Sequence, residues 1–215
     1  VFRAAPFAQY FFNSFFVGVV VTLAVIVTSL MAGYAFARLE FPGKALAFAL
    51  ILGTMMIPFE VTLIPNFVLV RKLGWYNTYA ALIIPWCASA FSIFLMRQAF
   101  MALPTDYFDA AKVDGCGHLR FLMRIAAPLV KPAIVTVGLF AFLGSYNSLI
   151  WPLVVTSEDS MRVVQVGLTV FSGAEGVRPQ LLMCASTIVI LPTVALYFMA
   201  QKYFLEGSLA AGIKG

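Results

Sequence analysis

Between two long apolar stretches the sequence reads Asp109-Ala110-Ala111-Lys112-Val113-Asp114-Gly115, and Ile125 and Pro128 follow it. The chain as a whole is 62% hydrophobic and only 11% charged, yet many of its charged residues lie in or beside this stretch. A charged side chain at the centre of a bilayer costs roughly 2.5–3.5 kcal/mol even on the mildest scale. The stretch is therefore predicted to lie at a membrane surface, as a short helix over about 105–117 that connects two spans.

Composition places the rest of the chain in the membrane. The mean hydropathy is +0.97 over 215 residues, and ordinary soluble domains are only roughly 45–50% apolar. The apolar stretches are long and do not alternate with polar residues, which favours membrane-spanning helices over the strands of a barrel. The predicted fold is an all-α membrane protein with a single transmembrane domain over residues 1–215.

Apolar stretches that approach the length of a spanning helix, about 20 residues, occur five times. They cover residues 12–36, 45–58, 79–95, 133–155 and 181–204, and a tail follows at about 205–215. Asn13 and Ser14 are predicted to cap the first helix. The second stretch is short, so we expect a kinked helix end near Pro58 and an interfacial helix after it. The fourth stretch is interrupted near residues 144–148.

The basic residues predict the orientation of the five spans. Nine of them fall on the side that holds the 105–117 helix, and five fall on the other side. The nine are Arg38, Lys44, Arg97, Lys112, Arg120, Arg124, Lys131, Lys202 and Lys214. The positive-inside rule places this side in the cytoplasm. A further helix before residue 1 would bring the count to six, with both termini cytoplasmic, and we expect it in the full subunit.

The sequence carries no recognisable catalytic motif. It has no phosphate-binding loop of the spacing Gly, four residues, Gly-Lys-Ser/Thr, and no Ser-His-Asp or Cys-His arrangement. The three cysteines lie far apart and are predicted to be free thiols, and His118, the single histidine, is predicted to be solvated. We therefore expect no catalytic residue, metal ligand or cofactor in this chain. The basic residues are scattered mostly singly between the apolar stretches and form no long run, which argues against nucleic-acid binding.

The spacing within the polar stretch resembles a family signature. Asp109-Ala110-Ala111 is followed by three residues and Gly115, then by nine residues and Ile125, and then by two residues and Pro128. This is similar to the Glu-Ala-Ala signature on a cytoplasmic loop of permease subunits of bacterial ABC importers. Asp109 replaces the glutamate, and an alanine replaces the leucine before the proline. An ordinary solvated connector is the alternative, but the combined spacing favours the signature.

Other segments extend the resemblance over nearly the whole chain. Residues 12–15 and 32–38 look like the family's second transmembrane helix. Residues 146–152 are similar to the Trp-Asn segment of sugar-importer permeases, with Tyr146 in place of the tryptophan. Residues 201–215 look like the C-terminus of relatives of the smaller maltose permease subunit. The resemblance thus implies the second permease subunit of the carbohydrate-uptake branch.

The resemblance also implies which residues would contact a separate ATPase. They are Asp109, Ala110, Ala111, Asp114, Gly115, Ile125 and Pro128, with Gly212, Lys214 and Gly215 reaching toward the ATPase dimer interface. The ATPase would bind ATP and Mg²⁺, a second permease would complete the pore as a heterodimer, and an extracytoplasmic solute-binding protein would deliver the solute. The implied location is the cytoplasmic (inner) membrane of a bacterium or archaeon, as a multi-pass protein in the lipid bilayer.

The candidates for the solute path are Tyr146, Asn147, Ser148 and Trp151, because they interrupt the fourth span and polar residues within a membrane are functional candidates. Aromatic faces and amides suit the C–H faces and hydroxyls of sugars. Two alternatives remain at this point. Serine and asparagine also join neighbouring helices, and tryptophan is common at membrane interfaces.

The leading hypothesis is an ABC importer permease for a sugar or related solute. One alternative is a permease of the same superfamily for a phosphorylated polyol, an amino acid or a peptide. Another is an ion-coupled secondary transporter, which would need intramembrane carboxylates that these spans almost lack. A membrane-embedded enzyme would need a cluster of His, Asp and Glu within the spans, and the sequence shows none.

Overall fold

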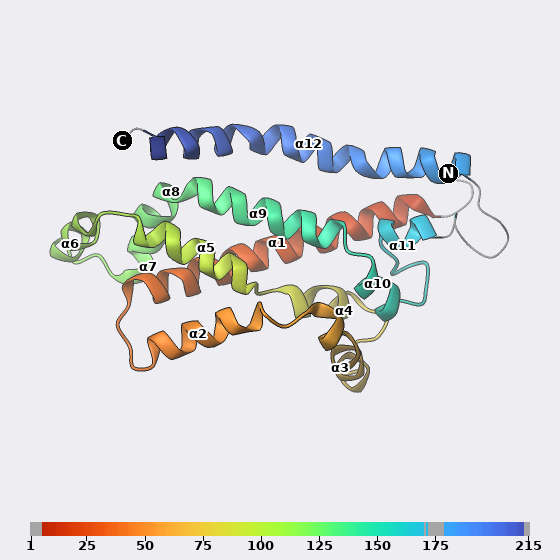
Figure 1. Ribbon diagram of the computed structural model, residues 1–215, viewed down its shortest axis with the longest axis horizontal. Helices are drawn as coiled ribbons and strands as arrows, with labels where there is room; N and C mark the ends of the chain where they lie inside the picture. The colour runs from red at the N-terminus through yellow and green to blue at the C-terminus, as the bar shows by residue number, and fades with distance from the viewer. Residues whose placement is uncertain (1–5, 170, 172–178, 213–215) are drawn as a thin grey trace. The chain divides into compact units, whose positions relative to one another are not determined.

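The chain is built from helices. The computed structural model describes residues 6–169, 171 and 179–212, and no strand occurs among them (Figure 1). The predicted all-α fold class is confirmed. In chain order the elements are α1 (Phe7–Arg38), α2 (Lys44–Thr54), α3 (Phe59–Lys72), α4 (Tyr79–Ile83), the 3₁₀ turn η1 (Ile84–Trp86), α5 (Ala90–Met101), α6 (Thr105–Val113), α7 (His118–Phe121), the π-helical turn η2 (Leu122–Ala126), α8 (Ala127–Leu129), α9 (Lys131–Tyr146), α10 (Ile150–Val155), α11 (Val164–Thr169) and α12 (Pro179–Gly212).

Among the described residues, two helices are each long and apolar enough to cross a membrane: α1, and α12 over Pro179–Met199. Three pairs of helices meet the same criterion together but are bent at a short break. The pairs are α2 with α3, α4–η1 with α5, and α7–α8 with α9. Counting each bent pair as one span gives five, the predicted number.

The break between α2 and α3 lies at the predicted position. Helix α2 ends at Thr54, and Pro58 has an extended backbone with φ −60° and ψ 140° directly before α3. A proline has no amide hydrogen to continue a helix and disfavours the helical conformation in the residue before it. The straight part of the second span is therefore only 11 residues long, and the chain continues as a separate helix.

Many large apolar side chains point away from the protein. On α2, Leu46 and Leu50 are exposed, and on α12 the same holds for Met183 and Met199. In water, each such side chain would forgo about 1.5–3 kcal/mol of burial energy. In a bilayer these faces contact lipid or another apolar helix surface at no such cost. This exposure fits membrane-spanning helices.

Contacts divide the chain into two compact units, each assembled from separate segments of sequence. Unit 1 comprises Val1–Leu23, Pro58–Cys87 and Leu139–Gln201, and unit 2 comprises Ala24–Ile57, Ala88–Gly138 and Lys202–Gly215. The polar stretch at 109–115 therefore belongs to unit 2, and the candidates for the solute path at 146–151 belong to unit 1. The single-domain assignment stays a prediction.

In unit 1, Asn13 joins the start of α1 to the segment before α11. Helix α1 begins at Phe7, so Asn13 and Ser14 lie inside the helix rather than capping it, contrary to the prediction. The buried Asn13 amide nitrogen donates to the carbonyls of Ser160 and Arg162, both at 2.8 Å, and its oxygen accepts from the Tyr79 hydroxyl at 2.7 Å. These bonds satisfy a polar side chain that would otherwise be costly to bury.

In unit 2, two arginines join the ends of α1 and α5. Arg38 donates to the carbonyls of Phe100 and Leu103 at the end of α5, and Arg97 donates to the Phe36 carbonyl at 3.1 Å. Carbonyls in the last turn of a helix lack partners within the helix, so cations bind there favourably. Leu103 lies two residues before α6 begins at Thr105, so Arg38 binds the chain close to the start of α6.

Candidate functional site

The polar stretch forms α6, a short helix between α5 and α7 (Figure 1). It begins after Pro104 and ends at Val113, four residues earlier than the predicted boundary at about 117. Gly115 has a φ of 68°, which costs little only for glycine, and donates to the Lys112 carbonyl at 3.1 Å, while the Cys116 amide donates to the Ala111 carbonyl at 2.8 Å. This pair of bonds is a Schellman motif, and it explains why the helix stops where it does.

The two sides of α6 are chemically different. Phe108 and Ala111 lie one turn apart and face the protein, and Ala111 is only 5% exposed. The opposite side consists of exposed residues, namely Asp106, Tyr107, Asp109, Ala110 and Val113. Val113 is 88% exposed although it is apolar. Of the two predicted contact alanines, only Ala110 is therefore available on the outer side, and Ala111 packs against the protein's own side chains.

The charges on α6 suit its direction. Asp106 lies in the first turn and Lys112 in the last turn, where the helix dipole favours a negative and a positive charge respectively. Asp109 and Asp114 are exposed, and no ion pair is described for either of them among the residues that the structure covers.

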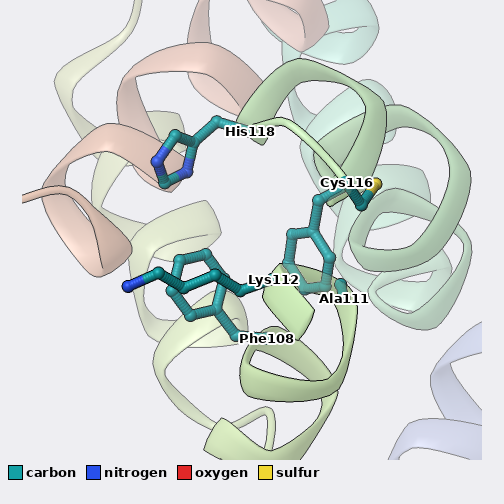
Figure 2. A pocket seen from close by; sticks show the side chains of 6 residues that line it. Phe108, Ala111, Lys112, Cys116 and His118 are labelled. Carbon is teal, nitrogen blue, oxygen red and sulfur yellow. The ribbon is translucent and has the colours of Figure 1, made fainter. Parts of the chain in front are cut away.

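A cavity of about 100 Å³ lies behind α6. Its lining comes from α6, α7 and the turn between them (Figure 2), and consists of Phe108, Ala111, Lys112, Cys116, His118 and Phe121. The His118 ring stacks on Phe108 with centroids 5.6 Å apart and planes inclined by 28°, and Phe108 meets Phe121 edge-on at 5.5 Å. These rings hold the inner side of α6.

The same cluster reaches α1 through Tyr34. The Tyr34 hydroxyl lies 3.0 Å from the His118 Nδ1 atom, and the tyrosine ring meets Phe100 edge-on at 5.7 Å. His118 is exposed, as predicted, but its ring also contacts two helices, which the sequence did not indicate. The available signal was the spacing of Phe108 and Ala111, which marks an inner face of α6 that some aromatic neighbour must cover.

Ile125 and Pro128 lie beyond α7 rather than on α6. Ile125 is half-buried in the π-helical turn η2, and Pro128 is exposed in α8. The chain then bends into α9. Their predicted part in an ATPase contact therefore depends on a surface that extends past the α6 helix, and it stays a prediction.

The C-terminal candidates are only partly described. Helix α12 continues to Gly212, so residues 205–212 are helical where a tail was predicted. Lys214 and Gly215 lie outside the described residues. The predicted role of this segment is untested.

The candidates for the solute path fall around the break between α9 and α10. Tyr146 is 1% exposed and its hydroxyl donates to the Val189 carbonyl at 3.0 Å. Trp151 is 2% exposed and its indole nitrogen donates to the Ala81 carbonyl at 2.9 Å. Ser148 is half-buried, whereas Asn147 is exposed and its oxygen accepts from the Gln165 amide at 3.3 Å. Asn147 is thus the accessible member of the set, although the predicted roles themselves remain untested.

No metal site emerges in the ranges that the structure covers. No three His, Cys, Asp or Glu side chains there lie close enough to hold an ion. Cys116 and Cys184 are free thiols, and the Cys87 thiol donates to the Ile83 carbonyl at 3.4 Å.

Comparison with known proteins links this geometry to a family. The family of binding-protein-dependent transport system inner membrane components matches residues 24–206. The chain is 34% identical over 213 residues to the arabinooligosaccharides transport system permease protein AraQ of Halalkalibacterium halodurans, covering 99% of this chain and 76% of that protein. It is also 34% identical to the sn-glycerol-3-phosphate transport system permease protein UgpE of Yersinia enterocolitica, covering 95% and 74%.

A solved structure agrees with these sequence matches. A chain of a bacterial ABC transporter involved in the import of the acidic polysaccharide alginate superposes with a TM-score of 0.82 and 25% identity, over 92% of this chain and 75% of that one. Both kinds of comparison cover nearly the whole chain. The chain belongs to the family of binding-protein-dependent transport system inner membrane components.

Proposed function

We propose that this chain is one transmembrane half of an ATP-driven ABC importer for a sugar or related solute, and that α6 couples it to a separate ATPase. The observation that carries the proposal is the signature spacing at Asp109, Gly115, Ile125 and Pro128, which begins on a helix whose outer side is exposed. Hydrolysis takes place in the partner, which binds ATP and Mg²⁺. This chain contributes the coupling surface and part of the pathway.

The docking surface is the outer side of α6. Val113 and Ala110 provide a small apolar patch, and the Asp109 and Asp106 carboxylates flank it. A groove that accepts a short helix takes apolar anchors in its floor and pairs charges at its rim. Asp109 retains the charge of the family's glutamate but is one methylene shorter, so its partner must approach more closely.

The assembly follows from this assignment. A second permease completes the pathway, an ATPase dimer binds on the cytoplasmic side, and a solute-binding protein docks on the opposite side of the inner membrane. The excess of basic residues on the side of α6 supports a cytoplasmic position for this helix. The proposal also assigns Gly212, Lys214 and Gly215 to a contact with the ATPase dimer.

A sugar-type solute is supported by two of the matched proteins, whose names refer to arabinooligosaccharides and to alginate. The exposed Asn147 amide, beside Gln165, offers hydrogen bonds of the kind that hydroxyl groups accept and donate. A phosphorylated polyol is the second candidate, because the match to an sn-glycerol-3-phosphate permease is 34% identical over 207 residues.

The first experiment is recovery of the tagged chain from its native membrane in mild detergent, followed by mass spectrometry. We expect a second permease and an ATPase to copurify, and we expect ATP hydrolysis in proteoliposomes to rise when the binding protein and its solute are added. A chain that is recovered alone and transports solute without ATP would overturn the importer assignment in favour of secondary transport.

The solute class is tested with the binding protein of the same system. Calorimetric titration with neutral oligosaccharides and with glycerol 3-phosphate distinguishes the two candidates directly. Binding of an oligosaccharide supports the sugar assignment, and exclusive binding of the phosphate ester replaces it with the second candidate.

A further inference from the structure

Helix α1 contacts the chain both just before and just after α6, the proposed coupling helix. Tyr34 and Arg38 are four residues apart and so project from the same side of α1. Arg38 donates to the Leu103 carbonyl, just before α6 begins, and the Tyr34 hydroxyl meets His118 just after the turn that ends α6. Two side chains of one helix therefore bracket the segment that contains α6.

His118 is the link between α1 and the body of α6. One edge of its ring, at Nδ1, lies 3.0 Å from the Tyr34 hydroxyl, while its face stacks on Phe108 at 5.6 Å. A hydrogen bond constrains the direction of approach, whereas ring stacking alone allows sliding. The two contacts together fix α6 against α1 in both position and orientation.

Apolar packing by itself would hold α6 less firmly. A partly open cavity of about 100 Å³ lies on the inner side of the helix, so part of that side has no packing partner. Ala111 adds only a methyl group there, and Lys112 and Cys116 line the remaining space. The hydrogen bond between Tyr34 and His118 is therefore the directional interaction that keeps the inner side of α6 in one position against α1.

We propose that His118 and Tyr34 are positioning residues, which lock α6 to α1 so that a displacement of α6 moves α1 rather than only the helix itself. This inference rests on the proposed function, in which an ATPase displaces α6. Coupling between distant sites is carried by packed side chains and rigid helices. Helix α1 is a single element of 32 residues, and it carries the displacement along its own length.

The test measures solute taken up per ATP hydrolysed by the whole transporter in proteoliposomes. Tyr34→Phe removes only the hydroxyl, and His118→Ala removes the ring. Each is expected to lower this ratio by roughly two- to tenfold, the range for loss of one hydrogen bond, while the subunits still copurify. His118→Asn keeps a short side chain with both a donor and an acceptor, and it should restore most of the coupling.

A matched control and a double variant sharpen the result. Tyr197→Phe removes a tyrosine hydroxyl from α12, where the side chain is exposed, and should leave the ratio unchanged. In the double variant Tyr34→Phe/His118→Ala, the solute taken up per ATP should be no lower than in the more impaired of the two single variants, because both substitutions remove the same contact.

A second measurement reports the packing of α6 directly, through the reactivity of a neighbouring cysteine. Cys116 lines the same cavity and is half-buried, so its rate of reaction with a thiol reagent reports whether the inner side of α6 stays packed. In the assembled transporter, Tyr34→Phe and His118→Ala should raise the labelling rate of Cys116, located by mass spectrometry, and Tyr197→Phe should not.

The outcomes separate this inference from the proposed function. Normal coupling and unchanged Cys116 labelling in both variants, in a transporter whose wild type is driven by ATP, would overturn the positioning role alone. A wild-type chain that recruits no ATPase would overturn the proposed function instead. If His118→Ala does not assemble, Tyr34→Phe decides, since it preserves the ring contacts.

Discussion

Helix α6 and the break between α9 and α10 both interrupt the apolar pattern of the sequence. The candidate residues of the two regions differ in whether they are exposed or buried. On α6, Asp109 and Ala110 are exposed. At the α9–α10 break, Tyr146 and Trp151 are buried and each donates a hydrogen bond to a carbonyl. The first pair of residues is exposed, and the second pair is packed within its own unit.

The difference shows how a polar or aromatic interruption should be interpreted in a membrane protein. A residue whose polar atoms are already satisfied inside the chain has little left to offer a solute. An exposed residue whose polar atoms form no bond within the chain retains its full capacity to bind other groups. By this criterion Asn147 resembles Asp109 more than it resembles its neighbour Tyr146.

The largest effect is expected for Gly115→Pro, because proline fixes φ near −65° where Gly115 has 68°. The substitution also removes the amide that donates to Lys112, so α6 cannot end as it does. Transport should be lost while the permease remains in the membrane, as measured by solute uptake alongside immunodetection of the inserted chain.

Gly74→Pro is a matched control for this substitution. Gly74 has a φ of 70° and ends α3 through the same pair of bonds, from Gly74 to Arg71 and from Trp75 to Val70. The substitution disrupts the same backbone conformation and bond pattern as at Gly115, but α3 is not the proposed coupling helix. Solute uptake per ATP should therefore persist in the Gly74 variant, and an equal loss in both would indicate general misfolding.

Val113→Asp should weaken the ATPase contact without harming the fold. The side chain is 88% exposed, and substitutions at such surface positions usually change stability by no more than about 0.5 kcal/mol. We expect an unchanged melting temperature for the purified permease and a reduced yield of copurified ATPase. Undiminished recovery of the ATPase would remove Val113 from the docking surface.

Trp151→Phe tests the other region. It deletes the indole N–H that reaches the Ala81 carbonyl, and leaving a buried acceptor without its partner costs about 1–3 kcal/mol. The melting temperature should fall while the KM for solute stays the same. A changed KM at unchanged stability would instead place Trp151 in contact with the solute.

The sequence predicted the helical class, the number of spans and the break at Pro58, because long apolar runs and prolines act locally. It also predicted a short helix at 105–117, although the Schellman motif ends that helix at Val113. The motif places the turn residues after the helix rather than within it. Boundaries set by one glycine are therefore predictable to within a turn of helix.

What the sequence could not predict depends on contacts between distant segments. Asn13 was expected to cap a helix, but it binds the carbonyls of Ser160 and Arg162, and nothing local to Asn13 indicates these partners. His118 likewise depends on Tyr34, 84 residues away. Such side chains look like ordinary polar residues until the fold brings their partners together.

Asn147→Ala is expected to have the smallest effect on stability and the most specific effect on function. The side chain is exposed and its bond to Gln165 is long at 3.3 Å, so the fold loses little. If Asn147 lines the path, the ratio of uptake rates for two competing solutes should change, while ATP hydrolysis without solute stays constant. Gln165→Ala removes the same bond from the other side. A change in selectivity for Asn147→Ala alone therefore points to contact with the solute, whereas equal behaviour of both variants points to the bond between them.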